Sequence, residues 1–185
     1  NNLSIQKAHK NLFVEPNYEL SGNGYIVMPA RDLCTLSEWV ADNIPQDSAN
    51  NAVIDGYLNN ALNILHSVAE QLEIYQNNNI IHFDIKPDNI FVFQENNGYF
   101  ARIIDFDSMM TFSEIEELLD KNQSLKLYST ANCYGLEIRH CDTLLKDGFS
   151  EKWKQIDVYP LGKLFAFILT GNKSLDFGSV VDSCF

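Results

Sequence analysis

The chain has 185 residues, of which 45% are hydrophobic and 21% charged, an ordinary composition for a globular domain with a sizeable core. Thirteen Lys and Arg against 25 Asp and Glu give a formal net charge of −12, which repels phosphate backbones and disfavours general nucleic-acid binding, although a local basic groove stays open. The strongly apolar run at 164–169 is too short to span a bilayer and no signal-peptide pattern opens the chain, so we expect no membrane partner and no secretion.

The predicted elements begin with a short strand at 25–28, which ends at Pro29 because proline cannot donate to a strand ladder. Apolar residues then recur at helical spacing over 33–40 and predict a short amphipathic helix. The polar, turn-rich residues 41–52 predict a loop.

The clearest helix is predicted over 57–75, where apolar residues repeat every three to four positions without Gly or Pro. Three asparagines at 77–79 end it. Apolar runs at 90–93 and 99–104, rich in β-branched and aromatic residues, flank an Asn-Gly turn and predict a β-hairpin.

Two further helices are predicted in the C-terminal half. Ser113 followed by Glu116 indicates a capping box for a helix over 114–121. We interpret its acidic residues as a solvated face, the alternative being a helix that guides a basic substrate. A helix at 161–169 is apolar on nearly every side and is therefore predicted to be buried.

The four cysteines are scattered and include no C-x-x-C pair. A metal site at Cys133, His140 and Cys141 is the alternative to free thiols, but this spacing matches no common zinc pattern. We therefore expect free thiols, which are typical of the reducing cytoplasm, at Cys34, Cys133, Cys141 and Cys184.

Polar residues that suit phosphate chemistry lie on turns beside the predicted hairpin. Asp84, Asn89 and Asp105 offer hard oxygen ligands of the kind that Mg²⁺ prefers, and Lys86 lies among them in the sequence. Phosphoryl transfer needs such ligands, together with a carboxylate that orients the attacking hydroxyl and a cation for developing charge. A lone aspartate at a strand end is more often a cap or turn residue, so the residue types alone do not separate the two interpretations.

Order and spacing identify a resemblance to protein kinases. Residues 82–90, HFDIKPDNI, closely resemble the kinase catalytic loop H-R-D-L-K-P-x-N-I. Residues 105–107, DFD, stand where kinases carry D-F-G, and 129–137 occupy the place of the G-T-x-x-Y-x-A-P-E segment. Residues 157–162, DVYPLG, resemble the D-V-W-S-L-G block, so four blocks occur in the kinase order over 25–177.

The resemblance implies an α+β fold: a kinase-like large lobe, mainly α-helical with short β-hairpins around the catalytic loop, and a small lobe that is largely absent. Residues 1–24 are then a remnant of small-lobe strands, and 25–185 form the C-terminal lobe, truncated after its central buried helix. No glycine-rich loop precedes Tyr25, and Lys7 and Lys10 lie too close to the hinge to serve as the small-lobe lysine. We expect a fragment of a longer kinase, the alternative being a natural protein that keeps only the large lobe.

The implied activity is ATP-dependent phosphoryl transfer to Ser or Thr of a protein, in a longer parent chain. Asp84 would orient the substrate hydroxyl and accept its proton, and Lys86 would offset charge at the γ-phosphate. Asn89 and Asp105 would hold Mg²⁺, with Mn²⁺ as an alternative ion, against the phosphates of ATP. Lysine two residues after the catalytic aspartate is typical of Ser/Thr kinases, whereas aminoglycoside- and choline-type phosphotransferases generally lack the Lys-Pro pair.

Binding of ATP is expected at a hinge ahead of the catalytic loop. Met28 would be the gatekeeper, and the backbone of Pro29 and Ala30 would meet adenine. The expected partner is a protein or peptide substrate, and basic residues in it would suit the acidic chain. The oligomeric state stays open.

Three residues are expected to support the site rather than to act in it. His82 would support the catalytic loop from beneath through hydrogen bonds, and Asp157 would anchor the backbone of that loop. Glu137 keeps the carboxylate of the A-P-E segment, although Gly135 and Leu136 replace its alanine and proline.

Two departures from the kinase pattern bear on activity. Phe83 replaces the arginine that pairs with a phosphorylated activation loop, so activity is not expected to need a phosphate on Ser129 or Thr130. Asp107 replaces the glycine of D-F-G, which we interpret as tolerated drift, the alternative being altered metal preference. These departures keep two other functions open: a pseudokinase-like binding or scaffold module without catalysis, and a small-molecule phosphotransferase.

Overall fold

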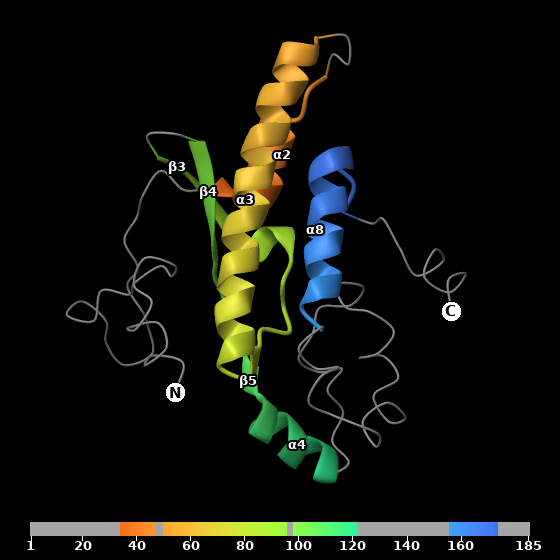
Figure 1. The fold of residues 1–185 in the computed structure, drawn as a ribbon. Coiled ribbons are helices and arrows are strands. Elements are labelled where there is room, and N and C mark those ends of the chain that lie inside the picture. The colour runs from red at the N-terminus through yellow and green to blue at the C-terminus, as the bar shows by residue number, and fades with distance from the viewer. Residues whose placement is uncertain (1–33, 47–49, 96–97, 122–155, 174–185) are drawn as a thin grey trace, which may run out of the picture. The chain divides into compact units, whose positions relative to one another are not determined.

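The computed structural model describes residues 34–46, 50–95, 98–121 and 156–173 (Figure 1). Its contacts divide the chain into two compact units, Asn1–Gln71 with Asp88–Ile104 and Leu72–Pro87 with Asp105–Phe185. In chain order the described elements are β1 (Cys34–Thr35), α2 (Leu36–Asn43), α3 (Asn51–Asn77), β2 (Ile80–Ile81), the 3-10 turn η1 (Pro87–Asn89), β3 (Ile90–Glu95), β4 (Gly98–Ile103), β5 (Met110–Thr111), α4 (Phe112–Asp120) and α8 (Val158–Thr170).

The first unit contains an antiparallel sheet of three strands in the order β1-β3-β4. The predicted hairpin is confirmed, with Ile90 opposite Ile103 and Glu95 opposite Gly98. Gly98 begins strand β4 and has φ +148°, a conformation that side chains with a Cβ rarely adopt. Figure 1 shows the hairpin beside α3.

Helix α2 begins at Leu36 because Thr35 caps it. The Thr35 hydroxyl accepts from the Glu38 amide at 3.2 Å, and the Glu38 carboxylate accepts from the Thr35 amide at 2.7 Å, which is a capping box. The predicted helix is confirmed. The predicted loop at 41–52 is wrong at both ends, since α2 continues to Asn43 and α3 starts at Asn51, and the polar residues there are exposed helix positions rather than loop.

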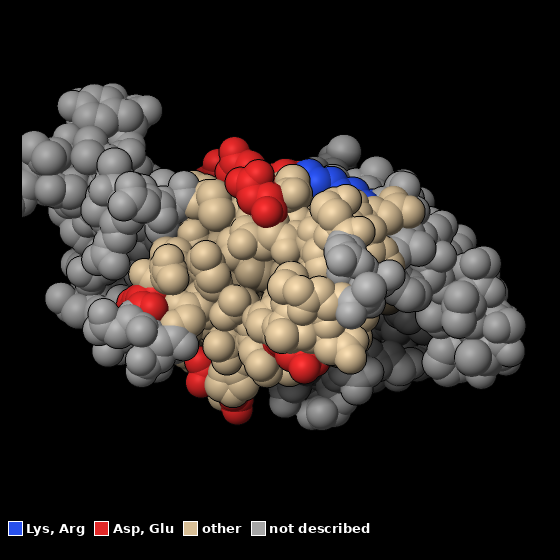
Figure 2. Space-filling model, turned by 90° about the horizontal axis from the view of Figure 1, so that it is seen from above, with Lys and Arg blue, Asp and Glu red and all other residues tan. Residues whose placement is uncertain are grey.

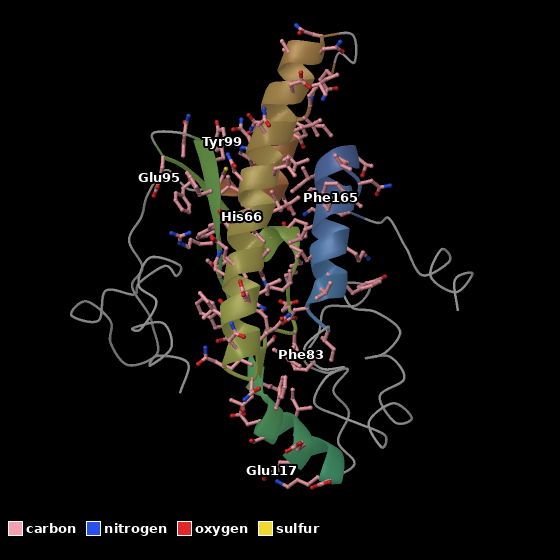
Figure 3. All side chains as sticks on the ribbon, in the orientation of Figure 1. His66, Phe83, Glu95, Tyr99, Glu117 and Phe165 are labelled. Carbon is pink, nitrogen blue, oxygen red and sulfur yellow. The ribbon has the colours of Figure 1, made fainter. Side chains whose placement is uncertain are left out.

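An aromatic cluster forms part of the core of the first unit. Trp39 of α2 stacks on Tyr57 of α3, with ring centroids 5.3 Å apart and planes 12° apart. Its edge meets Tyr99 of β4 at 5.5 Å, and Figure 3 labels Tyr99 beside α3. These three rings join both helices to the sheet, and offset stacked and edge-to-face pairs of this kind stabilise by about 0.5–1.5 kcal/mol beyond area burial.

The second unit starts with the last turns of α3. Asn79, at φ +56°, turns the chain out of the helix, as asparagine does at many helix ends. β2 then pairs antiparallel with β5, and the Phe112 amide donates to the Asn79 carbonyl at 2.9 Å. The core of this unit includes Ile80, Ile81, Ile85, Ile115, Leu164 and Ile168.

The cap of helix α4 is Thr111, two residues earlier than the predicted cap Ser113. The Glu114 carboxylate accepts from the Thr111 amide at 2.7 Å and from its hydroxyl at 2.8 Å, and the Thr111 hydroxyl accepts from the Glu114 amide at 3.3 Å. The capping box predicted at Ser113 and Glu116 is therefore wrong. Thr111 and Glu114 have the same three-residue spacing as Ser113 and Glu116. The pairing of β5 with β2 places Thr111 directly before the helix.

Helix α8 buries one face only. Leu164, Phe167 and Ile168 are buried, whereas Val158, Phe165 and Leu169 are 51%, 47% and 44% exposed. The helix itself was predicted correctly, but burial on every side was wrong. Gly171 ends it in the left-handed conformation, and its amide donates to the Phe167 carbonyl at 2.7 Å.

The predicted α+β fold class is confirmed by this mixture of helices and small antiparallel sheets. Within the described residues, no helix is long and apolar enough to cross a lipid bilayer. The strand predicted at 25–28 and the remnant strands expected in 1–24 lie outside the described residues.

Candidate functional site

The loop that follows β2 is anchored from two directions in the second unit. Its first residue, His82, is fully buried, and its amide donates to the Asp157 carboxylate at 2.9 Å. Asp157 is only 2% exposed and directly precedes α8. The Nδ1 atom of His82 accepts from the Asp84 amide at 3.3 Å, so the imidazole holds the loop backbone two residues on.

Asp84 and Lys86 form a partly buried ion pair on this loop. The Lys86 Nζ lies 2.7 Å from Asp84 Oδ2, and the two side chains are 24% and 9% exposed. Salt screens such a pair less than it screens an exposed one. A carboxylate held in this way can orient a hydroxyl group, and the adjacent ammonium can offset negative charge that develops nearby.

The backbone is left-handed at two positions in the second unit that belong to the kinase-like blocks. Phe83, which precedes Asp84, has φ +63°, and Asp105 also has φ +63°. This conformation is unusual for a bulky residue such as Phe83 and costs on the order of 1–3 kcal/mol there, whereas aspartate adopts it more readily. The Phe83 side chain is fully buried, and Figure 3 labels it on the loop after β2.

Aromatic contacts join this loop to its neighbours within the second unit. The His82 ring lies 6.1 Å from the ring of Tyr75 at the end of α3, and 6.1 Å from that of Phe106, which follows Asp105. Burial, and after it the nearby Asp157 carboxylate, raises the pKa of the Tyr75 phenol well above its ordinary value. The phenol therefore stays neutral at physiological pH.

Asn89 closes the turn η1 in the first unit and is 6% exposed. Its carbonyl accepts from the Ile104 amide at 2.9 Å, and Asp105, which is exposed, follows Ile104 in the chain. The amide oxygen of Asn89 and the carboxylate of Asp105 are each an oxygen ligand of the kind that Mg²⁺ prefers. No group of three or more His, Cys, Asp or Glu gathers among the described residues.

Several predicted site residues fall outside the described ranges. These include the proposed hinge residues Met28, Pro29 and Ala30, and also Glu137. Of the cysteines, Cys34 is described and is a free thiol, as predicted, and burial followed by Glu38 raises the pKa of that thiol.

Gln71, which no pattern in the sequence predicts as a site residue, joins α3 to the hairpin. Gln71 is fully buried, and its side-chain amide bonds to Ala101 and Ile103 of β4. One feature of the sequence could have indicated its role: Gln71 lies next to Leu72 on a helix whose apolar residues define a buried face, and a buried polar side chain needs hydrogen-bond partners.

No family model matches the sequence. An alignment over 88 residues, which covers 45% of this chain, shows 30% identity to the serine/threonine-protein kinase PknD of Chlamydia abortus, of which it covers 8%. The kinase domain in the structure of the Rad53 kinase domain and SCD2 aligns with a TM-score of 0.61 and 19% identity, over 92% of this chain and 51% of that one. The kinase domain of Mycobacterium tuberculosis PknI aligns with a TM-score of 0.53 and 14% identity, over 94% of this chain and 60% of that one.

The chain therefore has a protein-kinase-like fold, and the predicted resemblance to the protein-kinase superfamily is confirmed at the level of the fold. It spans between half and three fifths of the kinase chains to which it is similar, as a partial kinase-like lobe does.

Proposed function

We propose that the chain is the catalytic large lobe of a Ser/Thr-type protein kinase, which transfers the γ-phosphoryl group of ATP to a protein within a longer parent chain. The observation that carries the proposal is the Asp84–Lys86 pair, at 2.7 Å on a loop anchored through His82 and Asp157. Cation and carboxylate are thereby fixed side by side before substrate arrives, which is the preorganisation that electrostatic catalysis needs.

The roles follow from the chemistry of the two side chains. Asp84 accepts a hydrogen bond from the substrate hydroxyl, aligns its oxygen with the phosphorus and takes its proton as the new bond forms. Lys86 offsets the charge on the transferring group. His82 and Asp157 hold the loop, and we assign the same supporting task to Glu137.

Metal and nucleotide complete the proposal. Asn89 and Asp105 hold Mg²⁺, or Mn²⁺ in its place, and such an ion would neutralise charge on the ATP phosphates. Met28, Pro29 and Ala30 receive adenine. The proposed substrate is a protein or peptide, in the cytoplasm, with basic residues that suit the net charge of −12. Figure 2 shows one face on which acidic side chains of the described residues outweigh basic ones.

The test is transfer of label from ATP in the presence of Mg²⁺, with the full-length natural protein and its Asp84→Asn variant. We expect labelled protein from the parent and a loss of about 10²–10⁴-fold in rate in the variant, the usual contribution of a positioned acid–base group. Asp55→Asn, an equal charge change at an exposed position of α3, serves as the control and keeps the parent rate.

Other outcomes favour the other functions. Folded parent and variant that both stay unlabelled would replace the kinase with a binding module, which the buried Phe83 in place of arginine and the exposed Asp107 in place of glycine favour. Label on an aminoglycoside or sugar but on no protein would indicate a small-molecule phosphotransferase.

A further inference from the structure

The side chain of Gln71 takes the place of a strand partner at β4. Its Nε2 donates to the Ala101 carbonyl at 3.1 Å, and its Oε1 accepts from the Ile103 amide at 2.9 Å. β4 stands at the end of the strand order β1-β3-β4, so these two backbone groups belong to an edge strand of the described sheet. The carboxamide offers one donor and one acceptor to alternate residues, as a peptide group in a neighbouring strand would.

The orientation of this amide is fixed by a third bond. Nε2 also donates to the Ser67 carbonyl at 2.6 Å, one turn back on α3. Exchange of the oxygen and nitrogen would place Oε1 against two carbonyls and Nε2 against the Ile103 amide. One arrangement alone therefore satisfies all three bonds, and the side chain, which is fully buried, is held rigidly.

The bonds lie where β4 leads into the D-F-D segment. Gln71 holds the Ile103 amide, and the Asn89 carbonyl holds the Ile104 amide at 2.9 Å. Asp105 is the next residue and takes the left-handed φ of +63°. Two successive amides at the end of β4 are thus fixed, one by Gln71 and the other by Asn89, so the backbone of Asn89 is held against a strand end that Gln71 holds in turn.

We propose that Gln71 is a positioning residue for the proposed metal ligand Asn89, and that it acts through the end of β4, where the Ile104 amide donates to the Asn89 carbonyl. The inference rests on the proposed function, because that function makes Asn89 a metal ligand. Gln71 itself touches neither metal nor substrate. Residues that orient metal ligands without touching the metal typically change metal affinity by 10–100-fold when they are replaced.

A brace, meaning a residue whose hydrogen bonds only stabilise the fold, would behave differently from a positioning residue. Loss of the brace would lower the free energy of unfolding and leave the metal affinity of the folded protein unchanged. Loss of a positioning residue weakens metal binding in molecules that remain folded. Metal affinity measured on folded protein separates the two.

The experiment measures Mn²⁺ binding by electron paramagnetic resonance, in the presence of a non-hydrolysable ATP analogue, with the full-length natural protein. Gln71→Met keeps the side-chain length and removes the amide, and we expect its Mn²⁺ Kd to rise about tenfold or more. Ser67→Ala is the matched control, because the Ser67 hydroxyl is buried on the same helix but donates only to the Asn63 carbonyl, and we expect a Kd within about twofold of the parent. Hydrogen exchange at the Ile103 amide should accelerate in the Met variant alone.

Asp105→Asn separates failure of this inference from failure of the proposed function. If Asp105→Asn weakens Mn²⁺ binding while folded Gln71→Met binds as tightly as the parent, Gln71 is only a brace and the inference is overturned. If Asp105→Asn binds Mn²⁺ as the parent does, the proposed metal role fails first. Should Gln71→Met not fold, Gln71→Asn, whose amide is one methylene too short to reach β4, decides by the same comparison.

Discussion

Phe83 shows at the scale of one residue how a departure from the kinase pattern is accommodated. Its ring is fully buried in the protein interior and its backbone is left-handed. Because phenylalanine replaces arginine, the position carries no positive charge. The strain falls directly before Asp84, whose amide is held by His82. The structure thus shows a strained backbone beside the predicted catalytic carboxylate. A sequence motif cannot predict this strain, because it does not specify φ angles.

Because Phe83 offers no charge, a phosphate on the segment 129–137 would find no cation at that position. We therefore expect the double variant Ser129→Ala, Thr130→Ala to retain the parent rate of label transfer from ATP. Both hydroxyls lie outside the described residues. Loss of all transfer in the double variant, with the protein still folded, would contradict this expectation.

Tyr57 predicts how stability responds to alkaline pH. Burial raises the pKa of Tyr57 to about 12, whereas an unfolded chain ionises its tyrosines near pH 10. The unfolded state then releases its proton first, so the stability contribution is complete below about pH 10 and is lost as the pH rises toward 12. Urea unfolding at pH 9, 10 and 11 should show a steeper decline in the parent than in Tyr57→Phe, and equal slopes would argue against it.

At the scale of elements, two glycines of the first unit make opposite predictions. A Cβ on Gly98 would lie 3.0 Å from the Asn63 Nδ2 and would have to adopt φ +148°, so Gly98→Ala should destabilise by about 1–3 kcal/mol. Gly56 lies inside α3 with nothing within 4 Å of such a Cβ, so Gly56→Ala should stabilise by about 1 kcal/mol. Chemical denaturation of both variants measures the difference, and a shift in the same direction for both would refute the argument.

The elements also show how far local patterns predict this fold. The helical spacing of apolar residues predicted α2, α3 and α8, and runs of β-branched residues predicted the hairpin. These predictions succeed because the periodicity of a helix or strand is set by residues close together in the chain. The cap of α4 was misplaced because two T/S-x-x-E spacings overlap, and only the pairing of β5 with β2 selects Thr111. Gln71 was missed since its partners Ala101 and Ile103 lie about thirty residues away in sequence.

At the scale of the whole molecule, charge predicts the salt dependence of substrate recognition. The chain carries a formal net charge of −12, and the Debye length falls to about 8 Å at physiological ionic strength. We expect the KM for a peptide rich in Lys and Arg to rise as NaCl increases from about 0.05 to 0.3 M, because screening weakens attraction to the acidic surface. A neutral peptide with the same acceptor serine is the control, and parallel changes for both peptides would show that the field does not select substrates.

The order of the motifs predicted the fold at this scale, as the similarity to the Rad53 and PknI kinase domains shows. The roles of Asp84, Lys86, Asn89 and Asp105 stay predictions that the experiments above decide. The kinase resemblance implied that Asp157 anchors this loop, but nothing in the periodicity or local spacing of the sequence indicates the bond from the His82 amide to Asp157, which spans 75 positions. Such long-range bonds depend on packing and carry no local signature.

The bonds of Gln71 also bear on how the protein behaves in a crowded solution. An edge strand with open amide and carbonyl groups is a template on which a strand from another chain can add. At Ala101 and Ile103 those groups are already engaged by the carboxamide, so a foreign strand would have to displace a buried side chain to pair there. The same amide that holds the end of β4 thereby also protects this stretch of the strand against self-association.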